Sequence, residues 1–452
     1  MADNLLDKAS ILLTPTAYDN GSMLSVKPNK NLYGSELVTN GDFSQGSQDW
    51  TFNTNGNNQW SVANEKASYL GTATDFIITN NVLTIGKKYL VSFDILDTNG
   101  STIRLSVNSE VGGAFDNYTN GNGKYTTYLT ANTNYLRIGA SSSGASFSID
   151  NVSVKEDLTG DFTFSRGGNG SRINSSGNIV TESANIPRID YTDGCGSWLL
   201  EGQSTNLYLN SDTLATQSNA TSASTYTVSF YGTGTITFSG THTGTLVGTG
   251  ANDRVSVTFT ATSGTLTSTI SGTCTKGQLE QQSYATSYIP TEGATNTRLQ
   301  DIATNSGNST LINSTEGVLY FEAKTDNSNT GSISINNSSS TARITARFRS
   351  DISKIQLSII GSTNDFNFNS DVITLSDYNK IAIVYNSSGE YYFFVNGVKS
   401  SVQIKGTFTA DTLNQLDFNR GGGVEPFYGK AKALAVFKEA LTDAQLQSLT
   451  TI

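Results

Sequence analysis

A Ser-His-Asp or Cys-His catalytic device in this chain would have to use His242, because it is the only histidine in 452 residues. His242 lies in a run of glycine and threonine from Gly240 to Gly244, which predicts a hairpin loop and an exposed polar side chain. The two cysteines, Cys195 and Cys274, form no histidine and cysteine cluster of the kind that binds zinc. These residues therefore support neither nucleophilic catalysis nor a catalytic zinc.

Carboxylates are the remaining groups that could carry a reaction. A glycosidase needs only two of them, and the chain has 38 aspartates and glutamates, so counting alone cannot exclude one. The glycine-rich segments after Arg166 and Arg420 follow predicted strands but open no helix, so they are turns rather than phosphate cradles. We expect no catalytic residue and a protein that is not an enzyme.

Aromatic side chains near loops have the chemistry for a binding role. A ring can stack on the apolar face of a sugar while neighbouring Asn and Asp side chains hydrogen-bond its hydroxyl groups. The alternative for each ring is packing against its own sheet, which we expect for Trp50 and Trp198. The candidate glycan-binding residues are Trp60, Tyr69, Tyr118, Tyr125, Phe427 and Tyr428.

Composition indicates the elements that would hold these residues. Hydrophobic residues make up 36% of the chain and charged residues 15%, with 43 glycines and 5 prolines. Alternating apolar and polar residues between turns rich in glycine and asparagine predict antiparallel strands with one face in water. The predicted fold class is all-β, with tandem antiparallel β-sandwiches (jelly rolls) and an extended N-terminal anchor segment.

Charge and hydropathy exclude two classes of partner. The net charge is −10 and no block of Lys or Arg is present, so no nucleic acid is expected. No run of about 18 apolar residues is present, so no membrane span is expected. The opening residues, MADNLLDKAS, lack the pattern of a secretory signal, which favours assembly in a cytosol with free buried thiols.

Two blocks in the middle of the chain are the least generic part of the sequence. The first, Asp161 to Asn210, contains SRGGNGSRI, PRIDY and LLEGQSTNL, and the second is GQLEQQSYATSYIPTEGATNTR, Gly277 to Arg298. Together they resemble segments that recur in bacteriophage tail and virion appendage proteins. We expect the two blocks to pair in space, with a small sandwich at about 211–276 inserted between them.

That resemblance implies a bacteriophage virion structural protein, assembled in the host cytoplasm. It would be a tail fibre, tail spike or receptor-binding appendage that presents glycan-binding sandwiches to a host surface glycan. Such proteins are homo-oligomers, and a trimer is the expected state. One alternative is a purely architectural capsid, neck-decoration or head-fibre protein. Another is a polysaccharide depolymerase, although no β-helix repeat is found.

Residues 1–33 are too short for a core of their own. They form either a frayed tail or an anchor that docks on another virion protein (tail, portal/neck or capsid) by β-augmentation. The anchor is favoured because the segment is more apolar than a solvated tail needs to be. The predicted anchor residues are Ile11, Leu12, Leu13, Tyr18, Met23, Leu24 and Val26.

Two flanking domains complete the predicted division of the chain. Residues 34–157, with NGDF and SIDNVSV, resemble jelly-roll carbohydrate-binding modules, which implies a structural calcium at Asp150 and its companion Asp42. The alternative for Asp150 is a turn former at a strand end, and no other cofactor is expected.

Residues 158–300 form the appendage domain. Residues 301–452, with YFFVNG, resemble concanavalin-like and laminin-G-like jelly rolls, and Thr442 and Gln445 have capping-box spacing for a final helix.

Overall fold

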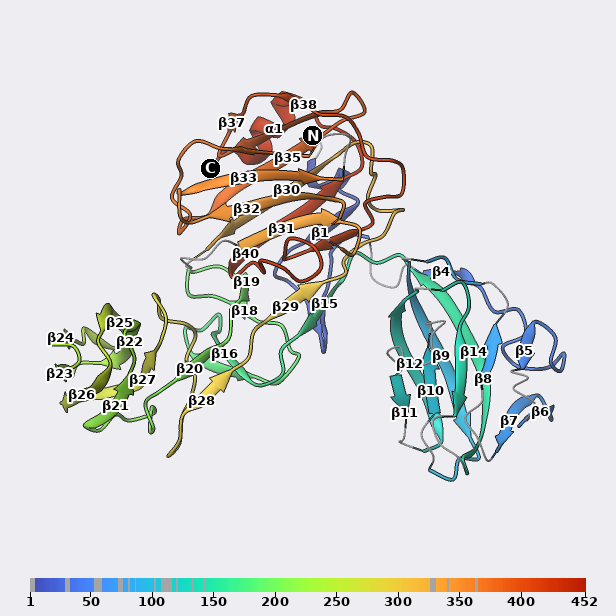
Figure 1. The fold of residues 1–452 in the computed structure, drawn as a ribbon, viewed down its shortest axis with the longest axis horizontal. Helices are drawn as coiled ribbons and strands as arrows, with labels where there is room; N and C mark the ends of the chain where they lie inside the picture. The colour runs from blue at the N-terminus through green and yellow to red at the C-terminus, as the bar shows by residue number, and fades with distance from the viewer. Residues whose placement is uncertain are drawn as a thin grey trace. The chain divides into compact units, whose positions relative to one another are not determined.

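The structure is a computed structural model of the chain. It describes all residues except 1–4, 29–32, 53–58, 72–75, 80–81, 86, 101–102, 107–115, 119–120, 132, 141–143, 326–330, 340 and 362–364, and only the backbone of 103–106, 116–118, 130 and 140. Contacts divide the chain into two compact units, residues 31–159 and residues 1–30 with 160–452. The predicted all-β class is confirmed, since the described residues form antiparallel sheets packed as sandwiches (Figure 1).

The unit at 31–159 is a sandwich of two sheets. One runs in the order β12 (Gly123–Thr130), β9 (Lys88–Leu96), β14 (Ser146–Asp157), β7 (Lys66–Leu70), β6 (Trp60–Ala63), with β4 (Tyr33–Glu36) also on β14. The other runs β11 (Asp116–Tyr118), β10 (Ile103–Ser106), β13 (Arg137–Ala140), β8 (Phe76–Thr79), β5 (Trp50–Phe52). Alternate residues of β9, from Tyr89 to Ile95, are buried in the core, and the residues between them face outward.

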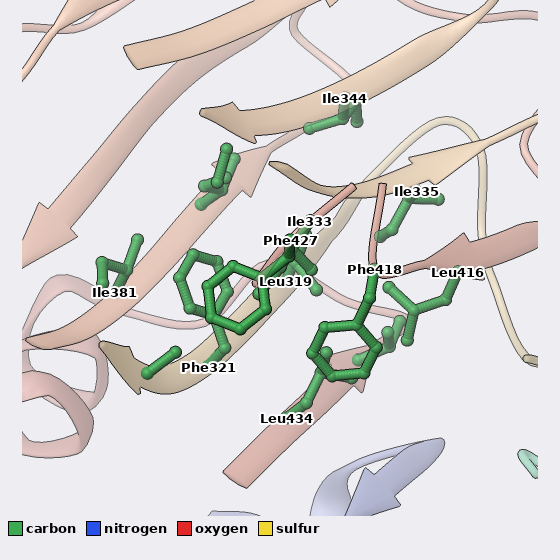
Figure 2. Packing of buried hydrophobic residues seen from close by; sticks show 14 of the residues in the cluster. Leu319, Phe321, Ile333, Ile335, Ile344, Ile381, Leu416, Phe418, Phe427 and Leu434 are labelled. Atoms are coloured by element: carbon green, nitrogen blue, oxygen red, sulfur yellow. The ribbon is translucent and has the colours of Figure 1, made fainter. Parts of the chain in front are cut away.

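The second unit contains a larger sandwich. Its first sheet runs β18 (Ile189–Asp190), β19 (Ser197–Leu200), β40 (Gly429–Phe437), β30 (Gly317–Lys324), β35 (Asn379–Tyr385), β36 (Glu390–Val395), β37 (Val398–Lys399), and β38 (Gln403–Ile404) also pairs with β36. The facing sheet runs β34 (Phe366–Asn369), β33 (Lys354–Ile360), β32 (Arg343–Arg349), β31 (Gly331–Asn336), β39 (Gln415–Asp417). Apolar side chains fill the space between them (Figure 2).

The sheet that contains β30 is buried on both faces. Leu319 and Phe321 point into the main core, whereas Val318 and Tyr320 belong to a second apolar cluster on the opposite face. That cluster is completed by η1 (Leu5–Lys8) and by α1 (Asp443–Thr450). The predicted capping box of α1 is confirmed, because Thr442 Oγ1 accepts from the Gln445 backbone while the Gln445 side chain accepts from the Thr442 backbone.

The N-terminal segment is a strand of this sandwich, which corrects the expectation of a separate anchor at residues 1–33. β1 (Ile11–Leu13) pairs with β40, with Leu13 opposite Leu434. β2 (Tyr18–Asp19) and β3 (Ser22–Met23) pair in turn with β15 (Phe162–Ser165), which also pairs with β29 (Ile302–Thr304). The apolar content of the segment is therefore used inside this chain.

The seven predicted anchor residues follow this arrangement closely. Ile11, Leu13 and Met23 lie in the main core and Leu12 in the second cluster. Leu24 is buried, Tyr18 packs edge-on to Trp198, and Val26 is 42% exposed. Six of these seven side chains are at least half-buried within this chain. Their apolar surface therefore gives no reason to expect an external partner at this segment.

The appendage-like blocks also belong to the larger sandwich rather than to a domain bounded at 300. β19 pairs with β40, and Phe162, Phe164, Trp198 and Leu200 lie in the main core. The predicted pairing of the two blocks is confirmed, because β20 (Ser204–Asn206) pairs with β28 (Asn296–Arg298). β16 (Gly170–Ile173) and β17 (Ile179–Glu182) form a hairpin beside them.

Between β20 and β28 lies the inserted sandwich. One of its sheets runs β21 (Gln217–Thr221), β26 (Gly264–Ser271), β23 (Thr235–Gly240), β24 (Gly244–Val247), and the other runs β25 (Gly250–Ala261), β22 (Ser224–Gly232), β27 (Cys274–Glu280). Tyr208, Tyr226, Phe230 and Leu266 are among the residues of its own core. Cys274 is a buried free thiol and Cys195 is an exposed one, so the expectation that both are buried holds for Cys274 only.

Candidate functional site

Two tyrosines meet on the outward face of the sheet that contains β9 and β12. Tyr128 is on β12 and is 47% exposed, and Tyr33 is on β4. Their hydroxyl groups are 2.7 Å apart, so the two side chains approach each other across the face. We call this pair and the outward face around it the tyrosine face.

Polar groups of several kinds surround the tyrosine pair. The Lys88 ammonium lies 5.1 Å from the centroid of the Tyr128 ring and 3.4 Å from the Asp157 carboxylate. One register step along, Thr126, Ser92 and Ser153 stand opposite one another on β12, β9 and β14. An aromatic surface flanked by an ammonium and hydroxyl groups can stack on a sugar ring and hydrogen-bond its hydroxyls.

Two of the predicted sugar-binding residues of this unit lie in its core. Trp60 and Tyr69 are both buried, with ring centroids 5.2 Å apart, and both also pack on Phe147. They lie on neighbouring strands β6 and β7 as a directly opposed pair, and the face they share points toward the second sheet. Their burial corrects the expectation that they stand beside a loop.

Tyr125 is half-buried and its ring stacks at 6.0 Å on the core residue Phe93, while its hydroxyl donates to the Gly121 carbonyl. Tyr128 is three residues further along the same strand and therefore points to the opposite face. Period-two alternation in KYTTYLT was the signal that could have selected Tyr128 instead of Tyr125. No local pattern indicates Tyr33, because its contact with Tyr128 spans 95 residues.

The other predicted sugar-binding residues do not form an exposed group. Phe427 is buried in the main core against Phe348 and Phe418 (Figure 2). Tyr428 is half-buried, its hydroxyl donates to Gln300 at 2.8 Å, and its ring covers Gly202. Tyr118 lies outside the residues whose side chains the structure describes.

Asp42 and Asp150, the predicted calcium ligands, lie near enough to influence each other. Burial raises the pKa of Asp150, and repulsion from Asp94, Asp42 and Glu65 raises it further against a hydrogen bond from the Asn151 backbone. The Asp42 carboxylate is exposed and accepts from the backbone and the hydroxyl of Ser44, which lowers its pKa. A divalent cation would relieve the repulsion, but among the described residues no three ligands converge as a metal site. Calcium binding stays a prediction.

Replacing Asp150 with Asn should raise the melting temperature of the 31–159 unit at pH 7 in the presence of a chelator. A carboxylate with a raised folded-state pKa contributes stability only while it is protonated, and that contribution is lost as the pH rises through the raised value. The gain should be below about 1 kcal/mol because the group is only partly buried and solvent screens its charge, and it should vanish below the ordinary pKa of 3.8. Calorimetry of the full chain at several pH values measures it.

The same experiment with millimolar calcium decides between the two interpretations of Asp150. If this carboxylate binds calcium, the ion should raise the melting temperature of the wild type and have no effect on the Asp150→Asn variant. Equal responses of both proteins to calcium would show that Asp150 is a turn residue and not a ligand.

A buried network of charges joins the two appendage-like blocks. Arg166 and Arg188 bind the two oxygens of Asp301 at 3.1 and 2.5 Å. Arg188 and Arg298 bind Glu201 at 2.7 and 2.9 Å. Each of these side chains is at least nine-tenths buried, and buried charges are stable only when they are paired and hydrogen-bonded.

Electrostatics within this network favour the charged forms. Burial opposes ionisation of Glu201, but Arg298 and Arg188 outweigh it and lower the pKa of Glu201 to about 2. Burial would also lower the pKa of Arg188, and the carboxylates of Asp301 and Glu201 raise it instead. The residues that make the sequence blocks distinctive therefore hold the blocks together.

Two further features bear on chemistry. His242 is half-buried and stacks on Phe259 with ring centroids 3.9 Å apart, and burial lowers its pKa. This ring has a packing role in the inserted sandwich instead of the exposed position that the loop predicted.

Within the part of the chain that the structure describes, no helix has the length and hydropathy to cross a membrane.

Comparison with known proteins finds partial similarities of fold. No protein-family model and no curated protein matches the sequence. A sialidase carbohydrate-binding module of Ruminococcus gnavus, bound to sialyllactose, is similar over 32% of this chain and 93% of its own, at 15% identity and a TM-score of 0.28. Domain 4 of an arabinanase from Geobacillus stearothermophilus is similar over 38% of this chain and 81% of its own, at 16% identity and a TM-score of 0.28.

The binding domain of botulinum neurotoxin serotype D is similar over 33% of this chain and 40% of its own, at 14% identity and a TM-score of 0.26. This chain therefore spans less than half of that domain. Each similarity is partial and at low identity, so none of them indicates what this chain binds.

Proposed function

We propose that this chain is a structural protein of a bacteriophage virion, a tail fibre, tail spike or receptor-binding appendage, that binds a glycan on the host surface. The tyrosine face is the proposed contact, and the observation that carries it is the hydroxyl-to-hydroxyl pairing of Tyr33 with the half-exposed Tyr128. The appendage-like blocks, fastened by a buried ion network, support the virion assignment. The proposal includes a homo-oligomer, with a trimer as the simplest match to a repeated site on a particle.

The arrangement of the tyrosine face favours binding over catalysis. A glycosidase acts through two carboxylates placed on either side of the scissile bond. Of the described carboxylates near the tyrosine pair, Asp157 is buried and paired with Lys88, whereas Glu36 is exposed and accepts from the Ser153 hydroxyl, so a pair of carboxylates is not presented to a ligand there. We therefore propose a non-enzymatic role, with a purely architectural virion protein as the alternative and a depolymerase as a further one.

Replacing Tyr128 with Ala should weaken binding to the recognised glycan on the order of tenfold, because a stacked ring and a cation–π partner are lost together. Replacing Tyr33 with Phe removes only the paired hydroxyl and should have a smaller effect. Ile404→Ala, which truncates an exposed apolar side chain of the other unit, is the matched control. Binding of the full chain to an array of bacterial surface polysaccharides, followed by titration, measures these effects.

The array also separates the competing functions. No binding to any polysaccharide would favour the architectural role, and unchanged binding by Tyr128→Ala would move the contact away from the tyrosine face. Release of reducing ends from a bound polysaccharide would establish a depolymerase.

A further inference from the structure

A cavity of about 210 Å³ lies where the β16–β17 hairpin, β18, β19 and β40 meet the inserted sandwich. We call it the Arg254 cleft. Hydroxyl groups of Ser171, Thr192, Thr286 and Tyr231 are part of its lining, together with apolar side chains such as Ile173 and Leu199. A mixed lining of hydroxyl and apolar groups around a small volume suits one sugar ring better than an extended apolar ligand.

Most charged groups of this lining are already paired with the protein. Arg172 binds Glu182 at 2.7 Å, and Lys430 binds Asp190 at 2.9 Å and Asp193 at 3.1 Å. The Glu201 carboxylate accepts from Ser287 and is bound by the arginines of the buried network. These pairs leave Arg254 as the charge of the cleft that needs a partner.

Arg254 projects from β25, and within the described part of the chain it makes a single hydrogen bond, from Nη2 to the Ser229 hydroxyl at 2.8 Å. Its guanidinium lies 6.0 Å from the centroid of the Tyr231 ring. Among the described residues the lining carboxylates, Asp190 and Glu201, form their ion pairs with other cations, and the buried Nε–H of Arg254 has no hydrogen-bond acceptor. A guanidinium of this kind offers two parallel donors to a carboxylate.

The charged groups around the cleft largely offset one another, since Lys430 is bound by two carboxylates, Asp190 and Asp193. The buried network beside it contains three arginines, Arg166, Arg188 and Arg298, against the two carboxylates of Glu201 and Asp301. Glu280 is the carboxylate that feels the charge of Arg254. It is a poor counter-ion for Arg254, because burial raises the pKa of Glu280 and its oxygens already accept from Ser204 and Thr286. The guanidinium of Arg254 is therefore the group of the cleft that favours an anionic ligand.

We propose that the Arg254 cleft binds a monosaccharide unit that carries a carboxylate, such as a uronic or a nonulosonic acid. The carboxylate pairs with the guanidinium of Arg254, and the sugar hydroxyls hydrogen-bond the hydroxyl groups of Thr192 and Tyr231, since those of Ser171 and Thr286 already donate to Tyr288 and Glu280. This inference rests on the proposed glycan-binding function and names the class of unit taken at a site separate from the tyrosine face.

The test uses the full chain and four probes in solution, D-galacturonate, N-acetylneuraminate, D-galactose and acetate, with binding measured by NMR titration. At least one acidic sugar should bind at least tenfold more tightly than galactose and acetate. Arg254→Gln should abolish that preference, whereas Tyr128→Ala should leave it unchanged. Ala285→Phe, which fills the cleft from a lining position, should block binding of the acidic sugar and serves if Arg254→Gln does not fold.

Three results would overturn this assignment. They are equal binding of acidic and neutral sugars, acetate binding as tightly as the acidic sugar, or retention of the acidic preference in both Arg254→Gln and Ala285→Phe. Loss of polysaccharide binding in Tyr128→Ala alongside any of these results would leave the proposed function standing without the Arg254 cleft. Binding of an acidic sugar at the Arg254 cleft without any polysaccharide binding would support the cleft and contradict the proposed function.

Discussion

Deleting residues 1–13 should unfold or aggregate the larger sandwich of this protein. The deletion removes β1, exposes the edge of β40 from Leu434 to Val436, and empties the core positions of Ile11 and Leu13. An unpaired apolar edge strand is a template for association, so we expect the truncated chain in the insoluble fraction. Expression, solubility and circular dichroism of the truncated and full chains measure the effect.

Single substitutions make the same prediction quantitative. Ile11→Ala and Leu13→Ala should each lower the free energy of unfolding by about 2–5 kcal/mol, since both side chains are fully buried. Val26→Ala is the matched control, because this residue of the same segment is exposed and its truncation should cost less than about 0.5 kcal/mol. A soluble truncated chain with an unchanged melting temperature would show that the segment is dispensable and restore the anchor hypothesis.

Replacing Asp301 with Ala should destabilise the second unit by about 3–5 kcal/mol, because Arg166 and Arg188 would both lose their buried partner. The Asp301 carboxylate also accepts from the Glu201 backbone at 2.8 Å, so the change frees a third donor. Chemical denaturation monitored in the second unit measures the loss. Asp443→Ala, which breaks the exposed pair with Lys399, is the control and should cost less than about 1 kcal/mol.

The same network predicts a sensitivity to acid. A carboxylate with a lowered folded-state pKa contributes stability above its unfolded value, and that contribution is lost as the pH falls through the folded value. For Glu201 this window runs from its ordinary pKa of 4.5 down to about 2. Glu201→Gln should flatten the stability profile over this range, and a profile as steep as that of the wild type would assign the acid sensitivity to other groups.

Strand periodicity was enough to predict the fold class, because alternation along β9 and the turns rich in glycine and asparagine are local signals. It could not place Ile11–Leu13, since a short apolar segment looks the same whether its partner is another protein or a strand more than 400 residues away. The separation of 158–300 from 301–452 failed for the same reason. Nothing local in Trp198 or Leu200 shows that they pack with Leu319 and Phe321.

The candidate site was predictable in kind but not in position. Sequence reasoning found that aromatic rings were the groups to consider, yet Trp60 and Tyr69 pair with each other in the core. Whether a ring faces water depends on which face of a sheet is covered, and that is a property of the whole sandwich. No sequence motif indicates Arg254, because its lack of an ion-pair partner among the described residues appears only once the surrounding carboxylates have been assigned to other cations.

The position of β40 governs how this chain can be made. The ribosome makes β1 before β40, so β1 cannot pair with β40 until the residues between the two strands have been synthesised. The 31–159 unit has its own core and can fold during synthesis. The larger sandwich uses residues on both sides of that unit in the sequence, so it completes its fold later. Synthesis that stops before residue 429 would yield a nascent chain in which β1 has no partner strand, and such a chain is a target for chaperones and proteases.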